Sequence, residues 1–286
     1  MGDARAVPDH EYGVGFVATY APCATCRSEV QTPMPAEAEL ASFYPATYHS
    51  MQADGFLVRM RNDVRWKRLS SLLGDDRTGA LLDYGCGEGQ FLRHVAERCP
   101  SIRLFGYEIG PEREVASHAD GRVTIVRGTV DDLLGVLPPC RLTTMNHVIE
   151  HLPDPVATVS RLVARLEPGG VFEGQTPAAG SLEHRIFGPR WSGYHAPRHT
   201  VVFSPQGLRS ALERAGLDAP RVAGAFNPAG LALSLASLRH DDRPSVLHRR
   251  GASWLAWLGL ASGLSLIDRL SGAPAVIDFD ARRGAR

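Results

Sequence analysis

The sequence predicts an α/β fold in which helices cover both faces of a mostly parallel sheet. In the middle of the chain, short apolar segments rich in β-branched residues alternate with segments of helical periodicity. Gly and Pro residues separate these segments, and a glycine-rich turn follows the first strand. Strands that alternate with helices form right-handed crossovers, so successive strands lie parallel in one sheet.

The predicted elements follow one another in a regular order. Segments with strand composition lie at residues 80–84, 102–108, 123–127, 142–148, 171–176, 221–226 and 275–280. Segments with apolar residues at helical spacing lie at residues 91–96, 155–166 and 205–215. Pro111, as a first-turn proline, predicts one more helix before residue 123. Asp154 and Ser204, each followed by proline, are N-cap signatures.

The flanks differ from this core, so the chain divides into four parts. Residues 1–50 form an N-terminal segment rich in Pro and Ala, with a short helix candidate after Pro35. Residues 51–226 form the core, which opens with a longer helix. Residues 227–274 look like an apolar helical insertion, and residues 275–286 supply the last strand of the core.

Charge and cysteine usage restrict the classes of partner. The 286 residues include 31 Lys and Arg and 31 Asp and Glu, so no overall field attracts the protein to nucleic acid or an anionic membrane. We therefore expect a local site for a small molecule. The five cysteines are an odd number, and no charged-then-apolar leader precedes them, which predicts free thiols in the cytoplasm.

The glycine-rich turn at residues 85–89 indicates a cofactor site. Only glycine lets a cofactor lie directly against the backbone, but Gln90 occupies the position of the third glycine in a dinucleotide fingerprint. Asp83 and Glu88 would repel a pyrophosphate and would favour a cationic cofactor, which indicates S-adenosylmethionine. Glu108, at the end of the next strand, is placed to accept hydrogen bonds from a ribose diol.

These residues resemble those of class I S-adenosylmethionine-dependent methyltransferases. The matching motifs are LLDYGCGEGQFL at residues 81–92, GYEIGP at 106–111, NHVIEHLPDP at 146–155, LEPGGVFEGQTP at 166–177 and WSGYHAPRHTVVFSPQGLRSALERAGL at 191–217. The last motif resembles a bacterial subgroup associated with sugar, polysaccharide and natural-product pathways. The resemblance implies a Rossmann-like sheet whose last strand is antiparallel.

The resemblance also implies roles for individual residues. The methionine end of the cofactor would lie on Asp83 and on the turn formed by Gly85, Cys86 and Gly87, with Glu108 on the ribose. The remaining implied cofactor contacts are Ile109 beside the adenine, Thr129, Val130 and Asp131 along the adenine edge, and Asn146 near the methyl group. The chain departs from the family in having Thr129 where an acid is common, and Cys140-Arg141 where Phe-Asp is usual.

A competing pattern, H-x-x-E-H, spans His147 to His151 and also occurs in zinc peptidases. A zinc peptidase needs both histidines on one face of a helix, whereas here a β-branched strand ends at His147 and Pro153 follows closely. We therefore expect no metal at this pattern and regard His151 as structural.

Three histidines are candidates for the base that a hydroxyl acceptor requires: His147, His195 and His199. For each of them, a histidine that anchors a loop is an equally open alternative. Trp191 and Tyr194 would give flat apolar surface to an acceptor or would fill a small core, and Arg198 would bind an anionic acceptor or tether the loop in an ion pair.

Two further features are local. Cys23 and Cys26 have the spacing of half a zinc site without a second pair, which predicts a degenerate zinc element; His10 or His49 could complete a real one. The uncharged run at residues 251–267, after Arg249-Arg250, contains Trp254 and Trp257 but no single apolar face. A buried helix or a subunit contact is favoured over membrane contact.

The sequence therefore predicts a methyltransferase that moves a methyl group from S-adenosylmethionine to a small molecule, with an oxygen acceptor favoured. An N- or C-methyltransferase and a non-catalytic binding or scaffold protein remain the alternatives. A nucleic-acid methyltransferase would need a basic stripe, and the basic pairs of this chain are isolated. A homodimer is compatible with the sequence.

Overall fold

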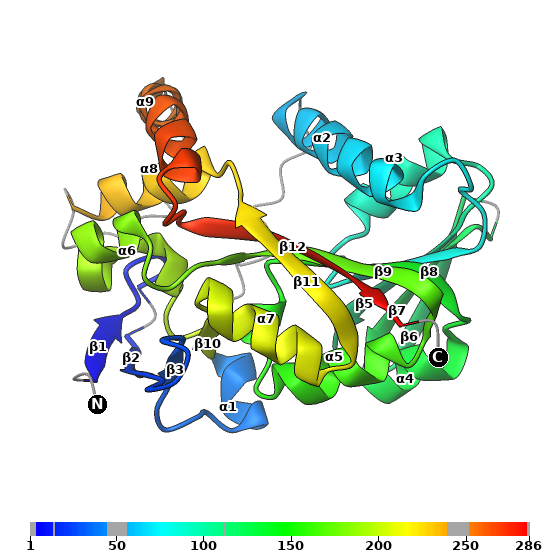
Figure 1. Cartoon of the computed structure of the whole chain (residues 1–286), viewed down its shortest axis with the longest axis horizontal. Coiled ribbons are helices and arrows are strands. Elements are labelled where there is room, and N and C mark those ends of the chain that lie inside the picture. The colour runs from blue at the N-terminus through cyan, green and yellow to red at the C-terminus, as the bar shows by residue number, and fades with distance from the viewer. Residues whose placement is uncertain are drawn as a thin grey trace.

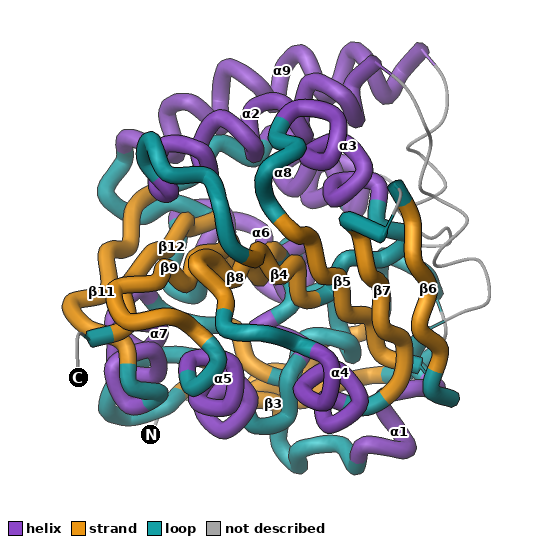
Figure 2. Tube along the Cα trace, turned by 90° about the vertical axis from the view of Figure 1, so that its right-hand side faces the viewer, coloured by secondary structure: helices purple, strands orange, loops and turns teal. Residues whose placement is uncertain are grey.

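A computed structural model describes residues 4–13, 15–44, 56–110, 112–119, 121–238 and 252–284. Its centre is an eight-stranded sheet with the strand order β11-β12-β9-β8-β4-β5-β7-β6 (Figures 1 and 2). The strands are β4 (Ala80–Tyr84), β5 (Arg103–Ile109), β6 (Glu114–His118), β7 (Val123–Gly128), β8 (Cys140–Asn146), β9 (Leu166–Pro177), β11 (Leu217–Gly224) and β12 (Val276–Arg283).

The sheet is mostly parallel, as predicted. Strand β4 pairs in parallel with β5 and β8, and the parallel pairing continues from β5 to β7 and from β8 to β9. The last strand, β12, runs antiparallel to both of its neighbours, β9 and β11. Consequently the carboxyl ends of β4, β5, β8 and β9 meet at one edge, where open α/β sheets bind ligands.

Helices cover both faces of this sheet (Figure 2). The helices on one face are α4 (Val130–Val136), α5 (Pro155–Val163) and α7 (Pro205–Arg214); those on the other include α2 (Phe56–Leu73) and α3 (Gln90–Arg98). Each face of the sheet has its own hydrophobic core. Within β4, Leu82 packs into the core beneath α4, α5 and α7, and Leu81 into the core beneath α2 and α3, since successive side chains of a strand point to opposite faces. The caps predicted at Asp154 and Ser204 begin α5 and α7.

The N-terminal segment forms a second sheet that the sequence did not indicate. Strand β2 (Val17–Pro22) pairs with β1 (Arg5–Pro8) on one side and with β3 (Glu29–Gln31) on the other. Strand β10 (Val201–Val202) pairs with the outer edge of β3. Helix α1 (Glu37–Ser42) follows, where a short helix was predicted. The pairing of β3 with β10 attaches this sheet to the segment that contains His195, Arg198 and His199.

One predicted element is wrong, and one predicted helix ends earlier than expected. The residues that follow Pro111, which itself lies outside the described part, form strand β6 rather than a helix, because the free edge of β7 pairs with them. Helix α5 ends at Val163 instead of continuing to residue 166, and β9 begins at Leu166 because Cys140 of β8 pairs with that residue. In both places long-range strand pairing prevails over local propensity.

The predicted insertion is helical in its described residues. Helix α8 (Pro228–Ser237) and helix α9 (Ala252–Leu270) lie together at one side of the large sheet (Figure 1). No helix among the described residues is long and apolar enough to cross a membrane. Arg249-Arg250 and the side chains of Trp254 and Trp257 lie outside the described part, so the predicted membrane and subunit contacts stay predictions.

A buried carboxyl group beside the insertion gives a first testable prediction. Glu183, on α6 (Leu182–Phe187), is 6% exposed, and burial together with the charge of Asp268 raises its pKa to about 8. The unfolded chain loses this proton near its ordinary pKa, so the free energy of unfolding falls as pH rises from about 5 to 8. Glu183→Gln should remove that slope and gain at least about 1 kcal/mol at pH 8, because one unit of pKa shift corresponds to about 1.4 kcal/mol.

Urea denaturation across this pH range measures the effect. Glu97→Gln is the matched control, since the Glu97 side chain is 75% exposed. Parallel stability profiles for Glu183→Gln and the unsubstituted protein would contradict the assignment.

Candidate functional site

The glycine-rich turn lies at the carboxyl edge of the sheet, between β4 and α3. Gly85 has a φ angle of +82°, which residues other than glycine rarely adopt. A Cβ atom at this position would lie 2.3 Å from Cγ2 of Val148. The turn is therefore in close contact with the loop that follows β8. The backbone N–H groups of Gly85 and Cys86 donate to the carbonyl of Tyr107, at 2.8 and 2.9 Å, which joins the turn to β5.

Glu108 lies beside this turn, as its predicted role requires. Its Oε2 accepts a hydrogen bond from the backbone N–H of Gly87 at 2.7 Å. Ile109 follows it with 70% of its surface exposed, so an apolar side chain is available at the edge where adenine is expected. The structure thus brings together Gly85, Gly87, Glu108 and Ile109, which are separated by up to 24 residues in the chain.

The side chain of Cys86 points away from this edge. A Cβ on Gly106 would lie 2.7 Å from the Cys86 sulfur, so the thiol packs into the space left by that glycine. Burial, with the charges of Asp83 and Glu108, raises the pKa of the thiol well above its usual range. The thiol is thus enclosed between β4 and β5, and the cofactor contact of Cys86 stays a prediction.

Asp83 forms an ion pair that the sequence did not reveal. Its carboxylate is 2.6 Å from Nη2 of Arg65 on α2, and the Arg65 guanidinium also lies 3.8 Å from the centre of the Phe91 ring. The same guanidinium donates to Thr144 at 3.1 Å, and to the amide oxygen of Asn146 at 3.0 and 3.1 Å when that amide is oriented with its oxygen toward Arg65. The site accordingly contains a positive and a negative charge side by side, rather than the bare carboxylate expected from sequence.

The residues predicted along the adenine edge surround the start of α4. Thr129 caps this helix and exchanges hydrogen bonds with Asp132, while Val130 is its first residue. Asp131 is 83% exposed and pairs with Arg161. The structure does not bring Asp131 into contact with the glycine turn, and its cofactor role stays a prediction.

His147 is the most accessible of the three predicted bases. It follows β8 with φ 52, and its side chain is 42% exposed. Nε2 is 2.9 Å from Oε1 of Gln175, and Nδ1 is 3.3 Å from Oε1 of the buried Glu150. Desolvation alone would lower the pKa of His147, but its contact with Glu150 outweighs this and raises it; the same contact lowers the pKa of Glu150 against the effect of burial.

The other two candidate bases are buried loop anchors. His195 pairs with Glu11 through Nδ1 at 2.5 Å and is 12% exposed. His199 is 5% exposed, and its Nδ1 donates to the carbonyl of Gly193 at 2.9 Å. Burial, with the neighbouring charges of His151 and His195, lowers the pKa of His199 well below its ordinary value. His195 also lines a small pocket together with Trp191 and Tyr194, and the catalytic roles of His195 and His199 stay predictions.

The predicted acceptor residues also turn out to be internal. Arg198 is 0% exposed and pairs with Asp9 at 2.7 Å, so it tethers the loop to the N-terminal segment and does not bind an acceptor. Trp191 and Tyr194 are 3% and 1% exposed and belong to the small core between the N-terminal sheet and α8. The structure thus shows the alternative kept open from sequence, in which these side chains fill a core and tether a loop, and a role in acceptor binding stays a prediction.

The cysteine pair lies in the turn between β2 and β3. Cys23 N–H donates to the carbonyl of Ser28 at 2.7 Å, and the thiol of Cys26 is 3.3 Å from the Ser28 hydroxyl. Among the described residues, neither cysteine belongs to a group of three metal-ligating side chains. His49 lies outside the described part, so completion of a zinc site by that residue is not tested.

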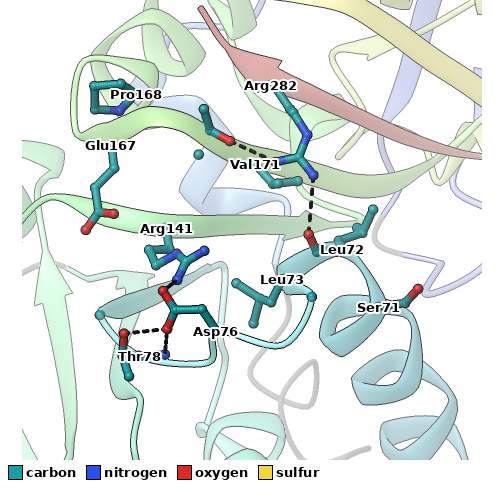
Figure 3. Close-up of a pocket in the computed structure, with 14 residues that line it drawn as sticks. Ser71, Leu72, Leu73, Asp76, Thr78, Arg141, Glu167, Pro168, Val171 and Arg282 are labelled. Atoms are coloured by element: carbon teal, nitrogen blue, oxygen red, sulfur yellow. Dashed lines mark hydrogen bonds and ion pairs between the residues drawn. The ribbon is translucent and has the colours of Figure 1, made fainter. Parts of the chain in front are cut away.

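A separate cleft lies at the opposite edge of the sheet (Figure 3). Its volume is about 430 Å³, and both arginines that line it are paired: Arg141 with Asp76, and Arg282 with the carbonyls of Gly169 and Leu72 at 2.9 and 3.4 Å. It lies at the amino ends of β4 and β8 and is separate from the glycine turn.

Comparison with known proteins agrees with this arrangement. Residues 58–220, more than half of the chain, match a family described as "Methyltransferase domain". The chain belongs to this methyltransferase family. The match spans the glycine turn, Glu108 and the His147 loop, so the predicted methyltransferase class, with S-adenosylmethionine as its methyl donor, is confirmed at the level of the family.

Curated relatives of this methyltransferase are more specific in name. A trans-aconitate 2-methyltransferase of Sinorhizobium fredii is 31% identical over 157 residues, which are 51% of this chain and 58% of that protein. The protein of the same name from Streptomyces coelicolor is 28% identical, over 49% of this chain and 51% of its own length. The chain spans about half the length of the curated relatives it matches.

Solved structures confirm the predicted fold. A SAM-dependent methyltransferase from Archaeoglobus fulgidus aligns with a TM-score of 0.50 at 17% identity, covering 79% of this chain and 94% of that one. Phosphoethanolamine N-methyltransferase 2 of Haemonchus contortus, in complex with S-adenosyl-L-methionine, aligns with a TM-score of 0.51 at 15% identity, covering 88% and 58%. These likenesses establish the class I methyltransferase architecture.

Proposed function

We propose that this methyltransferase transfers the methyl group of S-adenosylmethionine to an oxygen atom of a small-molecule acceptor. The observation on which the proposal rests is the meeting of three features at one sheet edge: the glycine turn with Glu108, the Asp83–Arg65 pair, and the exposed His147. The predicted association with sugar, polysaccharide or natural-product pathways remains part of this proposal.

The cofactor end of the site matches the charges of S-adenosylmethionine. The amino-acid end of S-adenosylmethionine has an ammonium and a carboxylate group. Asp83 carries the charge complementary to the ammonium, and Arg65 the charge complementary to the carboxylate. Glu108 offers carboxylate oxygens to a ribose diol while holding the Gly87 backbone in place. The bound sulfonium supplies an activated methyl group with a neutral thioether as leaving group.

The acceptor end needs mainly alignment and, for some acceptors, a base. An attacking oxygen must lie in line with the methyl–sulfur bond, and a site that fixes this geometry lowers the barrier substantially. A hydroxyl acceptor must also lose its proton, for which His147 at the carboxyl end of β8 is the accessible imidazole. A carboxylate acceptor is already ionised at neutral pH and needs no base.

Calorimetry with S-adenosylmethionine and S-adenosylhomocysteine tests the foundation. We expect binding of both; absence of binding to either ligand would contradict the proposal. Turnover is then screened with hydroxylated small molecules and with trans-aconitate, the substrate named for the curated relatives.

His147→Ala separates the two kinds of oxygen acceptor. With a hydroxyl acceptor we expect kcat to fall by about 10²-fold or more, because general base catalysis contributes about that much. With a carboxylate acceptor we expect kcat to change little. His118→Ala, on the exposed strand β6, serves as the control. An unchanged rate with a hydroxyl acceptor would leave alignment as the only contribution of this loop.

A further inference from the structure

Three histidines, His151, His195 and His199, and the buried Glu150 gather behind the accessible face of His147. Glu150, in the short 3-10 turn Ile149–His151, is 0% exposed, and its Oε2 accepts from the Thr176 hydroxyl at 2.9 Å. Its other oxygen, Oε1, is buried and receives no hydrogen bond of good geometry; its nearest donor is Nδ1 of His147, at 3.3 Å. One long contact with an imidazole whose side chain is 42% exposed compensates the burial of a carboxylate oxygen only in part, so this atom has room for a further positive partner.

The neighbours of that oxygen are imidazole nitrogens. Nε2 of His199 is 3.8 Å from Oε1, and one ligand atom each from Glu150, His151 and His199 lie within 4.8 Å of one another. Nδ1 of His147 is 3.3 Å from the same oxygen, so a fourth possible donor borders the group.

Backbone carbonyls determine which nitrogens are free. The carbonyl of Gly193 is 2.9 Å from Nδ1 of His199, and the carbonyl of Arg198 is 3.1 Å from Nδ1 of His151. A carbonyl oxygen only accepts, so Nδ1 of His199 carries the hydrogen and its Nε2 presents a lone pair. Nδ1 of His151 contacts the Arg198 carbonyl and also the Tyr44 hydroxyl, at 2.9 Å; a hydrogen on Nδ1 that these two oxygens share leaves the lone pair of His151 on Nε2. Metal-binding histidines are oriented in this way, by donating their second ring N–H to a carbonyl or carboxylate.

From this geometry we propose that Glu150, His151 and His199 bind a divalent transition-metal ion of the zinc type. Two imidazole nitrogens and one carboxylate oxygen suit zinc or cobalt, whereas magnesium and calcium prefer oxygen donors. Bonds of about 2.0–2.2 Å require the ligand atoms to approach by roughly 1 Å. The ion would neutralise Glu150 and fasten the segment leading into β10, and with it the N-terminal sheet, to the carboxyl edge of the large sheet.

The H-x-x-E-H pattern thus yields two of the three ligands without a helix. The sequence argument against a zinc peptidase holds, because His147 and His151 do not share a helical face, but the third ligand comes from His199, far along the chain. The expectation of no metal at this pattern is replaced by this proposal.

The test uses full-length protein in a Cys23→Ser/Cys26→Ser background, so that the cysteine pair cannot bind the added ion. Metal-free protein is titrated with Zn²⁺ against a chromophoric chelator, and with Co²⁺ by visible absorption. We expect one equivalent of metal and a Zn²⁺-dependent rise in Tm. Glu150→Gln and His199→Gln should each weaken binding at least tenfold, since even residues that only support metal ligands contribute about 10–100-fold.

Matched controls distinguish the site from nonspecific binding. Glu183→Gln replaces another buried glutamate and His118→Gln another histidine, and both should keep the affinity and the single equivalent. Equal Zn²⁺ affinity in the Glu150 and His199 variants and the controls would overturn the proposal, as would no binding of one equivalent. Circular dichroism and S-adenosylhomocysteine binding report folding in every variant, so a failed metal site is distinguishable from a failed methyltransferase assignment.

Discussion

Replacing Gly85 with alanine is expected to destabilise the protein by about 3 kcal/mol and to abolish measurable cofactor binding. Two effects add. A side chain at φ +82 costs about 1 kcal/mol or more, and the new Cβ would overlap Cγ2 of Val148 at 2.3 Å, an overpacking that costs about 1–3 kcal/mol. Relief of the overlap moves the turn backbone against which the cofactor must lie. Urea denaturation and calorimetry with S-adenosylhomocysteine measure the two losses.

Two companion variants separate strain from overlap. Gly74→Ala introduces a side chain at φ +72 with no heavy atom within 4 Å, so it should lose only about 1 kcal/mol and keep cofactor binding. Adding Val148→Ala to Gly85→Ala removes the overlapping methyl and should restore part of the stability. If Gly85→Ala binds cofactor as well as the unsubstituted protein, the glycine turn is not the cofactor site.

Replacing Glu108 with alanine is expected to weaken S-adenosylmethionine binding by about 10–100-fold. The substitution removes the predicted acceptor for the ribose and leaves the Gly87 N–H without its 2.7 Å partner, and hydrogen bonds to a charged group contribute about 1.5–3 kcal/mol each. Glu108→Gln keeps one acceptor oxygen, so its affinity for S-adenosylmethionine should lie between those of the unsubstituted protein and Glu108→Ala. Calorimetry measures all three affinities.

Glu97→Ala is the control for a lost carboxylate, because its side chain is 75% exposed on α3. It should leave the affinity unchanged. Unchanged affinity in Glu108→Ala would place the ribose elsewhere and would contradict the order of motifs on which the cofactor prediction depends.

Local sequence was sufficient to predict those elements whose conformation depends on neighbouring residues. The strand β4, the glycine turn and the start of α3 are contiguous, and alternation of apolar residues, positive-φ glycines and caps are read from neighbours in the chain. Glu108 was also found, because the end of the next parallel strand must lie beside the turn. The positions of Asp83, Gly85, Gly87 and Ile109 follow from the same rule.

Roles that depend on distant partners are missed or left open by the sequence. Arg65 lies on a helix with no motif, and only the folded chain places it 2.6 Å from Asp83. For Trp191, Tyr194 and Arg198 the sequence leaves an acceptor role and an internal role open, and the N-terminal sheet covers these residues in the folded chain. The sequence cannot decide between the two roles, because the pairing of β3 with β10 joins residues about 170 positions apart.

Short-range periodicity and contiguous motifs were enough to predict the sheet edge, the glycine turn and the methyltransferase class. Which charges and which histidines face one another depends instead on the folded chain. Long-range packing places Arg65 beside Asp83, leaves His147 as the most accessible of the three candidate bases, and gathers Glu150, His151 and His199 around a buried carboxylate oxygen. The physical reason is that burial and electrostatic pairing are properties of the assembled core, whereas strand and turn propensities belong to neighbouring residues.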